Sequence, residues 1–393
     1  MDGFAHLADE LDRLDAVGQL RTLRLVDGSA STVARVDGHR ALNFSSNNYL
    51  GLADHPALRD AAVRAITDEG FGAGASRLIS GNLASHRRLE EALARFHEVE
   101  AALVFGSGYQ ANVGVLSSLA GPDDLILSDA LNHASLIDGC RLSRAHVEVY
   151  PHASVAGVER VLTESVYARR RFVVTDSVFS MTGDVAPLVQ LRALCDRYDA
   201  TLIVDEAHAT GVLGPGGRGA CAALGVRPDV HVGTLSKALG AYGAYVAGDH
   251  TLIEYLTNTA RSFVFTTALP PSTSAAAMTA LALAAGPRGD QLRGVLGERL
   301  VELLAGFDEI GLPVRATGTP IVPIILGDAD RTMETSQRLL ELGVFAHGIR
   351  PPTVPPGSCR LRFSVMATHT SMDIATAVAA VAELVREGLI PRS

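Results

Sequence analysis

Short apolar runs alternate with helical segments through the middle of this 393-residue chain. Runs such as 125–128, 172–176 and 201–205 have the pattern of strands that are apolar on both faces. Such strands are typical of a mostly parallel sheet covered by helices. We therefore expect an α/β fold whose ligands bind at the carboxyl ends of the strands. The predicted strands are 101–105, 125–128, 147–150, 172–176, 201–205, 231–234 and 244–247, and the predicted helices are 86–97, 109–119, 135–142, 155–162 and 188–198.

The two ends of the chain have a different pattern. Residues 5–20 have helical periodicity, and two short strands, 31–36 and 39–43, flank a turn at Asp37-Gly38. After Pro270-Pro271 the pattern is helical to about residue 304. Strands at 322–326, 344–347 and 360–364 then mix with helices at 331–342 and 372–387. The predicted divisions are an N-terminal helix with short strands (1–48), a large α/β domain (49–285) and a smaller C-terminal α+β domain (286–393).

The composition excludes several classes of function. The net charge is −9, without a basic stripe or zinc-finger spacing, so we expect neither a nucleic-acid partner nor a bound metal. Four cysteines are far apart and form no C-x-x-C pair, as in proteins of a reducing cytoplasm. The first 20 residues are acidic and amphipathic, so we expect no signal peptide and no membrane span.

Lys237 is the only lysine among 34 lysine and arginine residues. Arginine replaces lysine at most solvated positions, but its guanidinium stays protonated and cannot act as an amine nucleophile. A lysine amine in a dry site can form an imine with a carbonyl. The small residues of the segment 233–240 leave room for a flat ligand. Lys237 is therefore a candidate for covalent catalysis, and the alternative is a surface lysine without a role.

Asp205 ends an apolar strand 32 residues before Lys237. A carboxylate in this position can hold the protonated nitrogen of a pyridine ring, which makes the ring an electron sink. The alternative for an aspartate at a strand end is a helix cap or a turn. His208 follows three residues later and could hydrogen-bond a ring hydroxyl or pack in the core.

Loops after three other predicted strands also carry polar groups. The segment 105–112 contains Gly106-Ser107-Gly108 and joins a strand to a helix, whose first N–H groups attract an anion such as a phosphate. A G-x-G turn is a weak signal by itself. His133 could stack on a flat ring, and Ser180 is a further hydroxyl after a strand. Together with Asp205 and Lys237, these features indicate a site for pyridoxal phosphate (PLP).

In order and spacing these residues resemble the aspartate-aminotransferase fold type (fold type I) of PLP enzymes, and within it the α-oxoamine synthase family. The resemblance spans nearly the whole chain, including the large domain that would bind PLP. The segments that carry it are 43–52, 74–77, 128–138, 175–184, 205–211 and 234–240. The segment 349–362 resembles the branch that makes 8-amino-7-oxononanoate for biotin. It is less similar to the glycine acetyltransferase, aminolevulinate synthase and serine palmitoyltransferase branches.

The resemblance implies roles around the cofactor. Lys237 would form the imine and later transfer the Cα proton. His133 would stack over the pyridine and Asp205 would bind its nitrogen. His208 and Ser180 would face the ring hydroxyl. The residues on the phosphate side would be Ser107, Gly108, Tyr109 and Thr234 and, from the neighbouring subunit of a homodimer with shared sites, Thr266 and Thr267.

The resemblance also implies the substrates. Arg362 would hold the amino-acid carboxylate, a bidentate task for a guanidinium. Arg21 and Thr353 match acyl-substrate positions, and we place Asn47 with the substrate-binding residues. The implied reaction joins L-alanine to a pimeloyl thioester of coenzyme A or an acyl carrier protein. It releases carbon dioxide and the thiol and gives 8-amino-7-oxononanoate.

Three departures from the family pattern leave the acyl chain open: Asn48, where the synthase often has aspartate, and Pro356 and Cys359 in the C-terminal segment. One alternative is a related synthase that uses glycine or serine and a different acyl thioester. Another is an aminotransferase. A third is a catalytically silent subunit that uses the fold as a scaffold, against which Lys237 argues, because such subunits typically lack the lysine.

Overall fold

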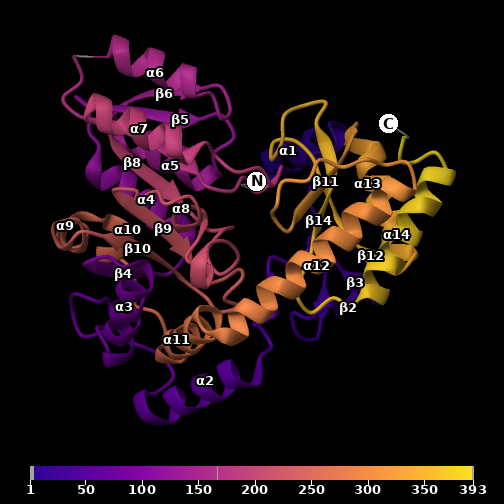
Figure 1. The fold of residues 1–393 in the computed structure, drawn as a ribbon, viewed down its shortest axis with the longest axis horizontal. Helices are drawn as coiled ribbons and strands as arrows, with labels where there is room; N and C mark the ends of the chain where they lie inside the picture. Colours follow the sequence, from indigo (N-terminus) through magenta and orange to yellow (C-terminus); the bar gives the residue numbers. More distant parts are fainter. Residues whose placement is uncertain (1–3, 166, 392–393) are drawn as a thin grey trace. The chain divides into compact units, whose positions relative to one another are not determined.

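The computed structural model describes residues 4–165 and 167–391. These residues form two compact units (Figure 1). The larger unit comprises 48–180 and 184–294, and the smaller unit comprises the residues up to Asn47, the short segment Met181–Gly183 and the residues from Val295 onward. The domain boundaries expected from the sequence stay a prediction, because these units describe packing and do not show which segments fold by themselves.

A seven-stranded sheet forms the centre of the larger unit. Its strands are β4 (Ala101–Phe105), β5 (Leu125–Asp129), β6 (His146–Tyr150), β7 (Arg171–Asp176), β8 (Thr201–Asp205), β9 (Val230–Thr234) and β10 (Ala244–Gly248), in the order β4-β10-β9-β8-β7-β5-β6. The neighbours from β9 to β6 are parallel, and β10 is antiparallel to both β4 and β9. The reversal has a simple cause, because the connection 235–243 is shorter than the dozen or more residues that a parallel crossover requires. The prediction of a mostly parallel sheet is confirmed.

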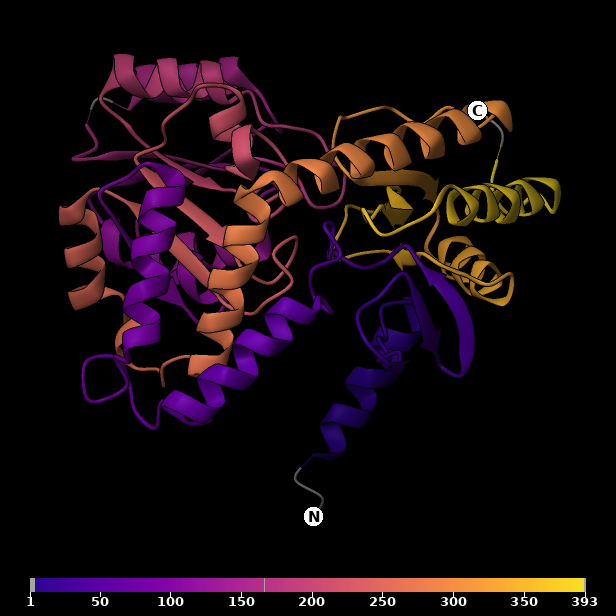
Figure 2. The ribbon, with the colours of Figure 1, turned by 60° about the horizontal axis from the view of Figure 1, so that its bottom comes forward.

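Helices cover this sheet. One face carries α4 (Gly108–Leu119), α5 (Ala134–Ser143), α9 (His250–Thr259) and α10 (Arg261–Val264), whose apolar side chains form one cluster with Ile126, Val174 and Val232 of the sheet. The unit also contains α2 (Pro56–Glu69), α3 (Ala84–His97), α6 (Val155–Glu164), α7 (Leu188–Tyr198), the short 3-10 helix η1 (Pro215–Gly217), α8 (Ala220–Ala223) and α11 (Pro271–Ala285). Figure 2 shows α2 packed along α11. None of the helices within the described ranges combines the length and apolar character that crossing a bilayer requires.

The strands of the larger unit end in polar residues. Asp129, Asp176, Asp205 and Thr234 are the last residues of β5, β7, β8 and β9, and all four are buried. Because these strands are parallel neighbours, their carboxyl ends meet at one edge of the sheet, the edge at which α/β proteins bind ligands. The strand pattern thus brings together polar groups that are far apart in the sequence.

The smaller unit contains two further sheets. Strands β1 (Val26–Asp27), β2 (Val33–Val36), β3 (His39–Asn43) and β12 (Val344–Phe345) form one sheet, in which β12 is parallel to β3. The antiparallel strands β11 (Ile321–Gly327), β14 (Cys359–Ser364) and β13 (His347–Ile349) form the other, in this order. The helices are α1 (Ala5–Ala16), α13 (Ala329–Glu341), α14 (Ser371–Arg386) and most of α12 (Pro287–Glu309), which begins in the larger unit. In the core, Phe363 contacts Phe44 and Phe307 at ring-centroid distances of 5.7 and 5.5 Å.

Several elements differ from their predicted bounds, and for two of them the local reason is clear. The N-terminal helix, predicted to residue 20, ends at Ala16, because the chain turns at Gly18, whose φ of +65° lies in the left-handed region. The predicted strand 344–347 is divided between β12 and β13, which belong to different sheets. The sequence pattern also fails to predict α2 and α9.

Candidate active site

Lys237 lies in the tight loop between β9 and β10. A hydrogen bond of 2.9 Å from Gly240 N to the Lys237 carbonyl closes part of this loop. Gly240 has a φ of +64°, and a Cβ there would lie 2.3 Å from Ala53 N, so glycine is required. The lysine side chain is half-buried, and its Nζ lies 2.9 Å from His208 Nε2. The loop therefore holds the amine in a defined position.

His208 connects Lys237 to a buried tyrosine. Its Nδ1 lies 2.7 Å from the hydroxyl of Tyr49, a side chain with no exposed surface. When Lys237 donates to Nε2, the proton of the imidazole is on Nδ1, which then donates to the Tyr49 oxygen. Tyr49 thus fixes the orientation of the ring that faces the lysine.

Asp205 is held from two sides at the end of β8. Its Oδ1 accepts the Ala207 N–H at 2.8 Å, and its Oδ2 accepts Asn112 Nδ2 at 2.7 Å. The residue is 5% exposed. A carboxylate with two fixed donors keeps its orientation, and each oxygen retains a lone pair for one more donor. This arrangement suits the N–H of a pyridinium ring.

A second carboxylate, Asp176, lies on the neighbouring strand. Asp176 and Asp205 are register partners at the ends of β7 and β8. Burial, together with the charge of Asp205, raises the pKa of Asp176 well above its ordinary value. Asp176 Oδ2 accepts the backbone N–H of His133 at 2.7 Å. Asp176 therefore favours its protonated form and holds the loop that carries His133.

His133 precedes α5 and is held through one ring nitrogen. Its Nδ1 accepts the Ser135 N–H at 3.2 Å and lies 2.7 Å from Ser135 Oγ. Desolvation lowers the His133 pKa, Lys237 adds to this effect, and Asp205 opposes it. The residue itself is exposed. A neutral, accessible imidazole can stack on a flat ring.

The N-terminus of α4 offers a place for an anion. Ser107 is its N-cap, and Ser107 Oγ accepts the Gln110 N–H at 3.2 Å. Gly108 and Tyr109 belong to the first turn, whose N–H groups have no acceptor inside an α-helix. The Tyr109 hydroxyl donates to Asp138 of α5 at 2.6 Å, so the side chain of Tyr109 is held by a second helix. A Cβ on Gly108 would meet no heavy atom within 4 Å, so this chain leaves open space where a phosphate would bind.

Thr234 and Ser180 lie in loops that follow strands of the sheet. The Thr234 hydroxyl donates to the Gly243 carbonyl at 3.0 Å and lies 2.8 Å from Ser236 Oγ, so it helps to close the lysine loop. Ser180 follows Val178, whose bridge to Val185 closes the loop after β7. Contacts of either hydroxyl with a ligand stay a prediction. Ser236 is exposed next to Lys237 and is a further hydroxyl that the sequence reasoning did not single out.

Thr266 and Thr267 follow α10. Thr267 forms an isolated antiparallel bridge with Ser76, and Ala268 N donates to the Ala75 carbonyl at 3.0 Å. This pairing joins the threonines to the segment 74–77, which also carries the family resemblance. Thr267 is exposed, whereas Thr266 is half-buried. Their contact with a second subunit stays a prediction.

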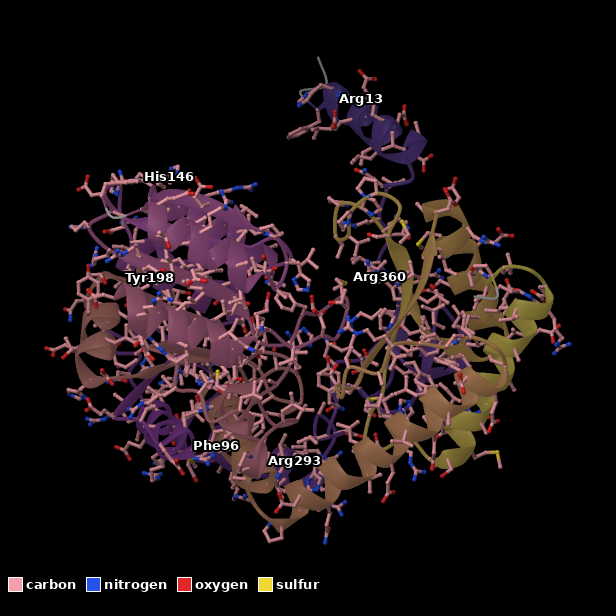
Figure 3. The ribbon with its side chains drawn as sticks, turned by 45° about the horizontal axis from the view of Figure 1, so that its top comes forward. Arg13, Phe96, His146, Tyr198, Arg293 and Arg360 are labelled. Atoms are coloured by element: carbon pink, nitrogen blue, oxygen red, sulfur yellow. The ribbon has the colours of Figure 1, made fainter. Side chains whose placement is uncertain are left out.

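The four predicted substrate residues form two pairs in the smaller unit. Arg362 on β14 is 8% exposed and donates from Nη2 to Asn47 Oδ1 at 3.0 Å. Arg21 donates to Thr353 Oγ1 at 3.2 Å, and both residues are exposed. Arg360, which lies two residues before Arg362 (Figure 3), donates instead to the carbonyl oxygens at positions 358 and 181.

Sequence reasoning missed four buried polar residues of this region, namely Tyr49, Asn112, Ser135 and Asp176. All four lie in segments that were singled out for other residues. A signal was present, because a polar side chain inside a buried segment needs a hydrogen-bonding partner. Ser135 contacts the nearby His133, but the partners of Tyr49, Asn112 and Asp176 are far away in the sequence, so their identity could not be predicted.

Asn48, which departs from the family pattern, has a structural role. Its Oδ1 accepts the Ala53 N–H at 3.1 Å. An aspartate oxygen would accept the same hydrogen bond, so the exchange leaves this turn intact.

The residues of the larger unit fit the cofactor expected from the sequence. They provide an amine for an aldehyde, a buried carboxylate for a ring nitrogen, an imidazole for a ring face and a helix N-terminus with open space for a phosphate. The individual roles of these residues stay predictions.

Comparisons with known proteins identify the relatives of this chain. Residues 40–381 match the model of the family described as aminotransferase class I and II. The 8-amino-7-oxononanoate synthase of Geotalea daltonii is 50% identical over 382 residues, which are 96% of this chain and 97% of that protein. Among solved structures, the serine palmitoyltransferase from S. paucimobilis with bound PLP and myriocin is 32% identical to this chain. Its TM-score is 0.92, and the match covers 98% of both chains. The 8-amino-7-oxononanoate synthase of Francisella tularensis is 29% identical with a TM-score of 0.76, covering 89% of this chain and 99% of that one. The predicted PLP fold type I is thereby confirmed.

The open space at Gly108 gives a first prediction. Gly108→Ala should weaken PLP binding, because the added methyl group enters the space for the phosphate. It should not destabilise the chain, because alanine in a helix is favoured over glycine by roughly 0.5–1 kcal/mol. Fluorescence titration measures the dissociation constant, and thermal melting without PLP measures stability.

Gly106→Ala is the contrasting control for this experiment. A Cβ on Gly106 would lie 2.4 Å from Gln110 Oε1, the end of a flexible side chain that can move aside, so this variant should keep both its stability and its PLP affinity. Equal PLP affinities of the wild type and Gly108→Ala would place the phosphate elsewhere.

His152 ties the end of β5 to the loop that carries Ser180. Its Nδ1 lies 2.9 Å from Asp129 Oδ1, and its Nε2 lies 2.6 Å from Asp184 Oδ2. Desolvation lowers the His152 pKa, but the two carboxylates together outweigh it and raise the pKa above its ordinary value. Because the folded pKa is the higher one, the imidazolium stabilises the fold fully below about pH 6.5, the unfolded value. This stabilisation is lost as the pH rises through the folded pKa.

His152→Asn should therefore flatten the pH dependence of stability. We expect the wild type to lose more free energy of unfolding than the variant between about pH 6 and about pH 9, measured by urea titration. His146→Asn is the matched control, because His146 at the start of β6 (Figure 3) pairs with Glu148 on the surface, where such pairs contribute little. Equal slopes for the wild type and His152→Asn would contradict this account.

Proposed function

Because the chain belongs to the class I and II aminotransferase family and to its α-oxoamine synthases, we propose that it makes 8-amino-7-oxononanoate for biotin biosynthesis. It condenses L-alanine with a pimeloyl thioester and uses pyridoxal phosphate as cofactor. The observation that carries the reaction type is the only lysine of the chain, Lys237, held 2.9 Å from His208 in the loop after β9. The choice of product rests on relatives of that name that are 50% identical over 96% of the chain.

Bound PLP supplies an aldehyde and a protonated ring that withdraws electrons from the substrate. Asp205 holds the proton of the ring nitrogen with a carboxylate that Asn112 and Ala207 keep in place. The Nζ of Lys237 removes the Cα proton of alanine and later returns it. His133 would stack on the ring as a neutral imidazole, because its pKa is lowered, and would then add no cation that competes for Asp205.

The bonds that change are the same for any acyl thioester. A carbon–carbon bond forms between the Cα of alanine and the thioester carbonyl carbon, and the carbon–sulfur bond breaks to release the thiol. The bond between Cα and the carboxylate of alanine then breaks, carbon dioxide leaves, and a proton adds to the electron pair that remains on Cα. Coenzyme A and an acyl carrier protein both supply a suitable thiol.

Arg362 binds the carboxylate of alanine in this proposal. Its guanidinium is 8% exposed, and Asn47 holds one of its nitrogens, so it is pre-oriented for a bidentate contact. Arg21 and Thr353 lie at a pocket of about 210 Å³ together with Arg24 and Arg350. Such a pocket suits an anionic part of the acyl substrate.

A related synthase is the second candidate. The solved serine palmitoyltransferase matches the fold with a TM-score of 0.92, above the 0.76 of the solved 8-amino-7-oxononanoate synthase. Sequence identity favours the first reading, because the curated 8-amino-7-oxononanoate synthases are 50% identical and the serine palmitoyltransferase is 32% identical. Identity weighs more here, because substrate choice depends on side chains and not on the path of the backbone.

We also propose a homodimer with shared sites. The Ser76–Thr267 bridge brings together two loops with exposed apolar side chains, and among them Ile79 is 80% exposed and Phe265 is 71% exposed. Exposed apolar side chains that gather in one region are typical of a surface covered by a partner. Thr266 and Thr267 would then contribute to the phosphate site of the other subunit.

The proposed location is the cytoplasm. The four cysteines are separate, buried thiols, as is usual in a reducing compartment. Fractionation of the producing cells tests this, and recovery of the enzyme outside the cytoplasm would contradict it.

A substrate screen tests the proposed function. Purified enzyme is mixed with alanine, glycine or serine and with acyl thioesters of different chain length, on coenzyme A or on acyl carrier protein, and thiol release is measured. We expect the fastest release with alanine and a pimeloyl thioester. A preference for glycine or serine would favour the second candidate, and no release with any pair would contradict an α-oxoamine synthase.

Arg362→Ala is the matched variant for this screen. It should retain PLP but require at least about 30-fold more alanine, because a buried carboxylate without its charged partner costs roughly 2–5 kcal/mol. Arg350→Ala is the control, because the Arg350 guanidinium already donates to the Leu20 carbonyl. If Arg350→Ala alone raised the alanine requirement, the carboxylate would belong to Arg350.

Complementation tests the shared site. Lys237→Ala subunits and Thr266→Ala/Thr267→Ala subunits should each have little activity. Mixing them should restore part of it, because one of the two sites in a mixed dimer is then intact. An active enzyme that sediments as a monomer would contradict this proposal.

A further inference from the structure

We propose that Asn112 is a positioning residue that couples the ring-nitrogen acid Asp205 to the stacking residue His133. One hydrogen of its amide group holds Asp205, and the other holds Ser135, which in turn fixes His133. The contacts are properties of the chain itself. Only their use in binding PLP rests on the proposed function.

Asn112 lies in the first half of α4, close to both partners. Its side chain is 1% exposed. Asn112 Nδ2 donates to Asp205 Oδ2 at 2.7 Å and to Ser135 Oγ at 2.9 Å. These two bonds use both hydrogens of the amide nitrogen. One side chain thus joins the end of β8 to the start of α5.

The directions of these hydrogen bonds follow from their chemistry. A carboxylate oxygen only accepts, so the amide nitrogen of Asn112, and not its oxygen, faces Asp205. The same nitrogen then donates to Ser135 Oγ, because it has no lone pair to offer. The one hydroxyl hydrogen of Ser135 is therefore available for His133 Nδ1, which lies 2.7 Å away.

This series of hydrogen bonds selects one tautomer of the His133 ring. Nδ1 accepts from the Ser135 hydroxyl and also from the Ser135 N–H at 3.2 Å, so it has no proton of its own. The proton of the neutral ring is on Nε2, which points away from these donors. The backbone of His133 is fixed separately, by Asp176. His133 therefore has both its position and its tautomer determined.

The charged groups around His133 make the protonation of its ring sensitive to the two donors at Nδ1. Asp205 favours a protonated ring, whereas Lys237 and desolvation favour a neutral one. Two donors at Nδ1 oppose protonation at that nitrogen. If these two donors were lost, fewer groups would oppose the effect of Asp205, which favours the protonated ring. The His133 ring would then take up a proton at a higher pH.

Nitrogen-15 NMR of histidine-labelled protein, first without PLP, directly tests the hydrogen bonds from Asn112 through Ser135 to His133. His133→Asn identifies the His133 signals among those of the 13 histidines. In the wild type we expect a bare Nδ1 and a protonated Nε2. Ser135→Ala should mix the two tautomers and raise the pH at which His133 titrates. Ser135→Thr restores a hydroxyl, so the tautomer populations and the titration pH should both return towards the wild-type values.

Asn112→Leu tests the coupling, because it keeps the volume and removes both donors. It should change the His133 signals and also weaken PLP binding by about 10-fold or more, since Asp205 loses a charge-assisted hydrogen bond. Ser135→Ala should weaken PLP binding less than Asn112→Leu does, because Asp205 keeps its bond to Asn112. Ser117→Ala on the same helix is the control, because that hydroxyl bonds only to the helix carbonyl of Val113, and it should change neither property.

An unchanged His133 tautomer in Ser135→Ala would overturn the proposal, and so would an Asn112→Leu protein with wild-type PLP affinity. If Asn112→Leu does not fold, as judged by circular dichroism, the Ser135 variants decide the outcome alone. Failure of the substrate screen would affect the proposed function and not these results, because the NMR and PLP-binding measurements use no substrate.

Discussion

The buried carboxylate of Asp205 is the interaction on which the site depends. A charge at the end of an apolar strand is costly to bury unless donors surround it. Asn112 and Ala207 supply these donors, and the position of Asn112 in α4 ties the helix to the strand. Burial, together with the charge of Asp205, raises the pKa of Asp176 on the next strand, and protonation of Asp176 avoids a second buried anion. Asp205 therefore influences the protonation of its neighbour Asp176.

The change of strand direction at β10 has a related consequence. A short connection after β9 forces an antiparallel return, and the residues of this connection project from the carboxyl edge of the sheet. Lys237 lies on this connection, where Gly240 permits a close approach to Ala53. The lysine thus reaches the edge at which Asp176 and Asp205 end their strands. A longer crossover helix would have left no tight loop for it at this edge.

The sequence predicts most of the large sheet because its strands are apolar runs with polar ends. The bounds of β4 and β8 agree with the prediction. The sequence does not predict that the segment 344–349 is divided between two sheets, because the sheet that a short strand joins depends on distant partners. The chemistry of Lys237 and Asp205 can be recognised from residue type and spacing. Tyr49 could not be assigned in this way, because its partner His208 is 159 residues away.

The central claim, that Lys237 forms the covalent link to the cofactor, can be tested by reduction with borohydride in the presence of PLP. The chain has one lysine, so the only other candidate is the N-terminal amine. Peptide mapping by mass spectrometry should find the reduced cofactor on the peptide that contains Lys237. Lys237→Arg should carry no label there and should have no turnover, because a guanidinium neither condenses with the aldehyde nor transfers a proton near neutral pH. A wild type without label at Lys237, or a Lys237→Arg enzyme with substantial turnover, would contradict the account.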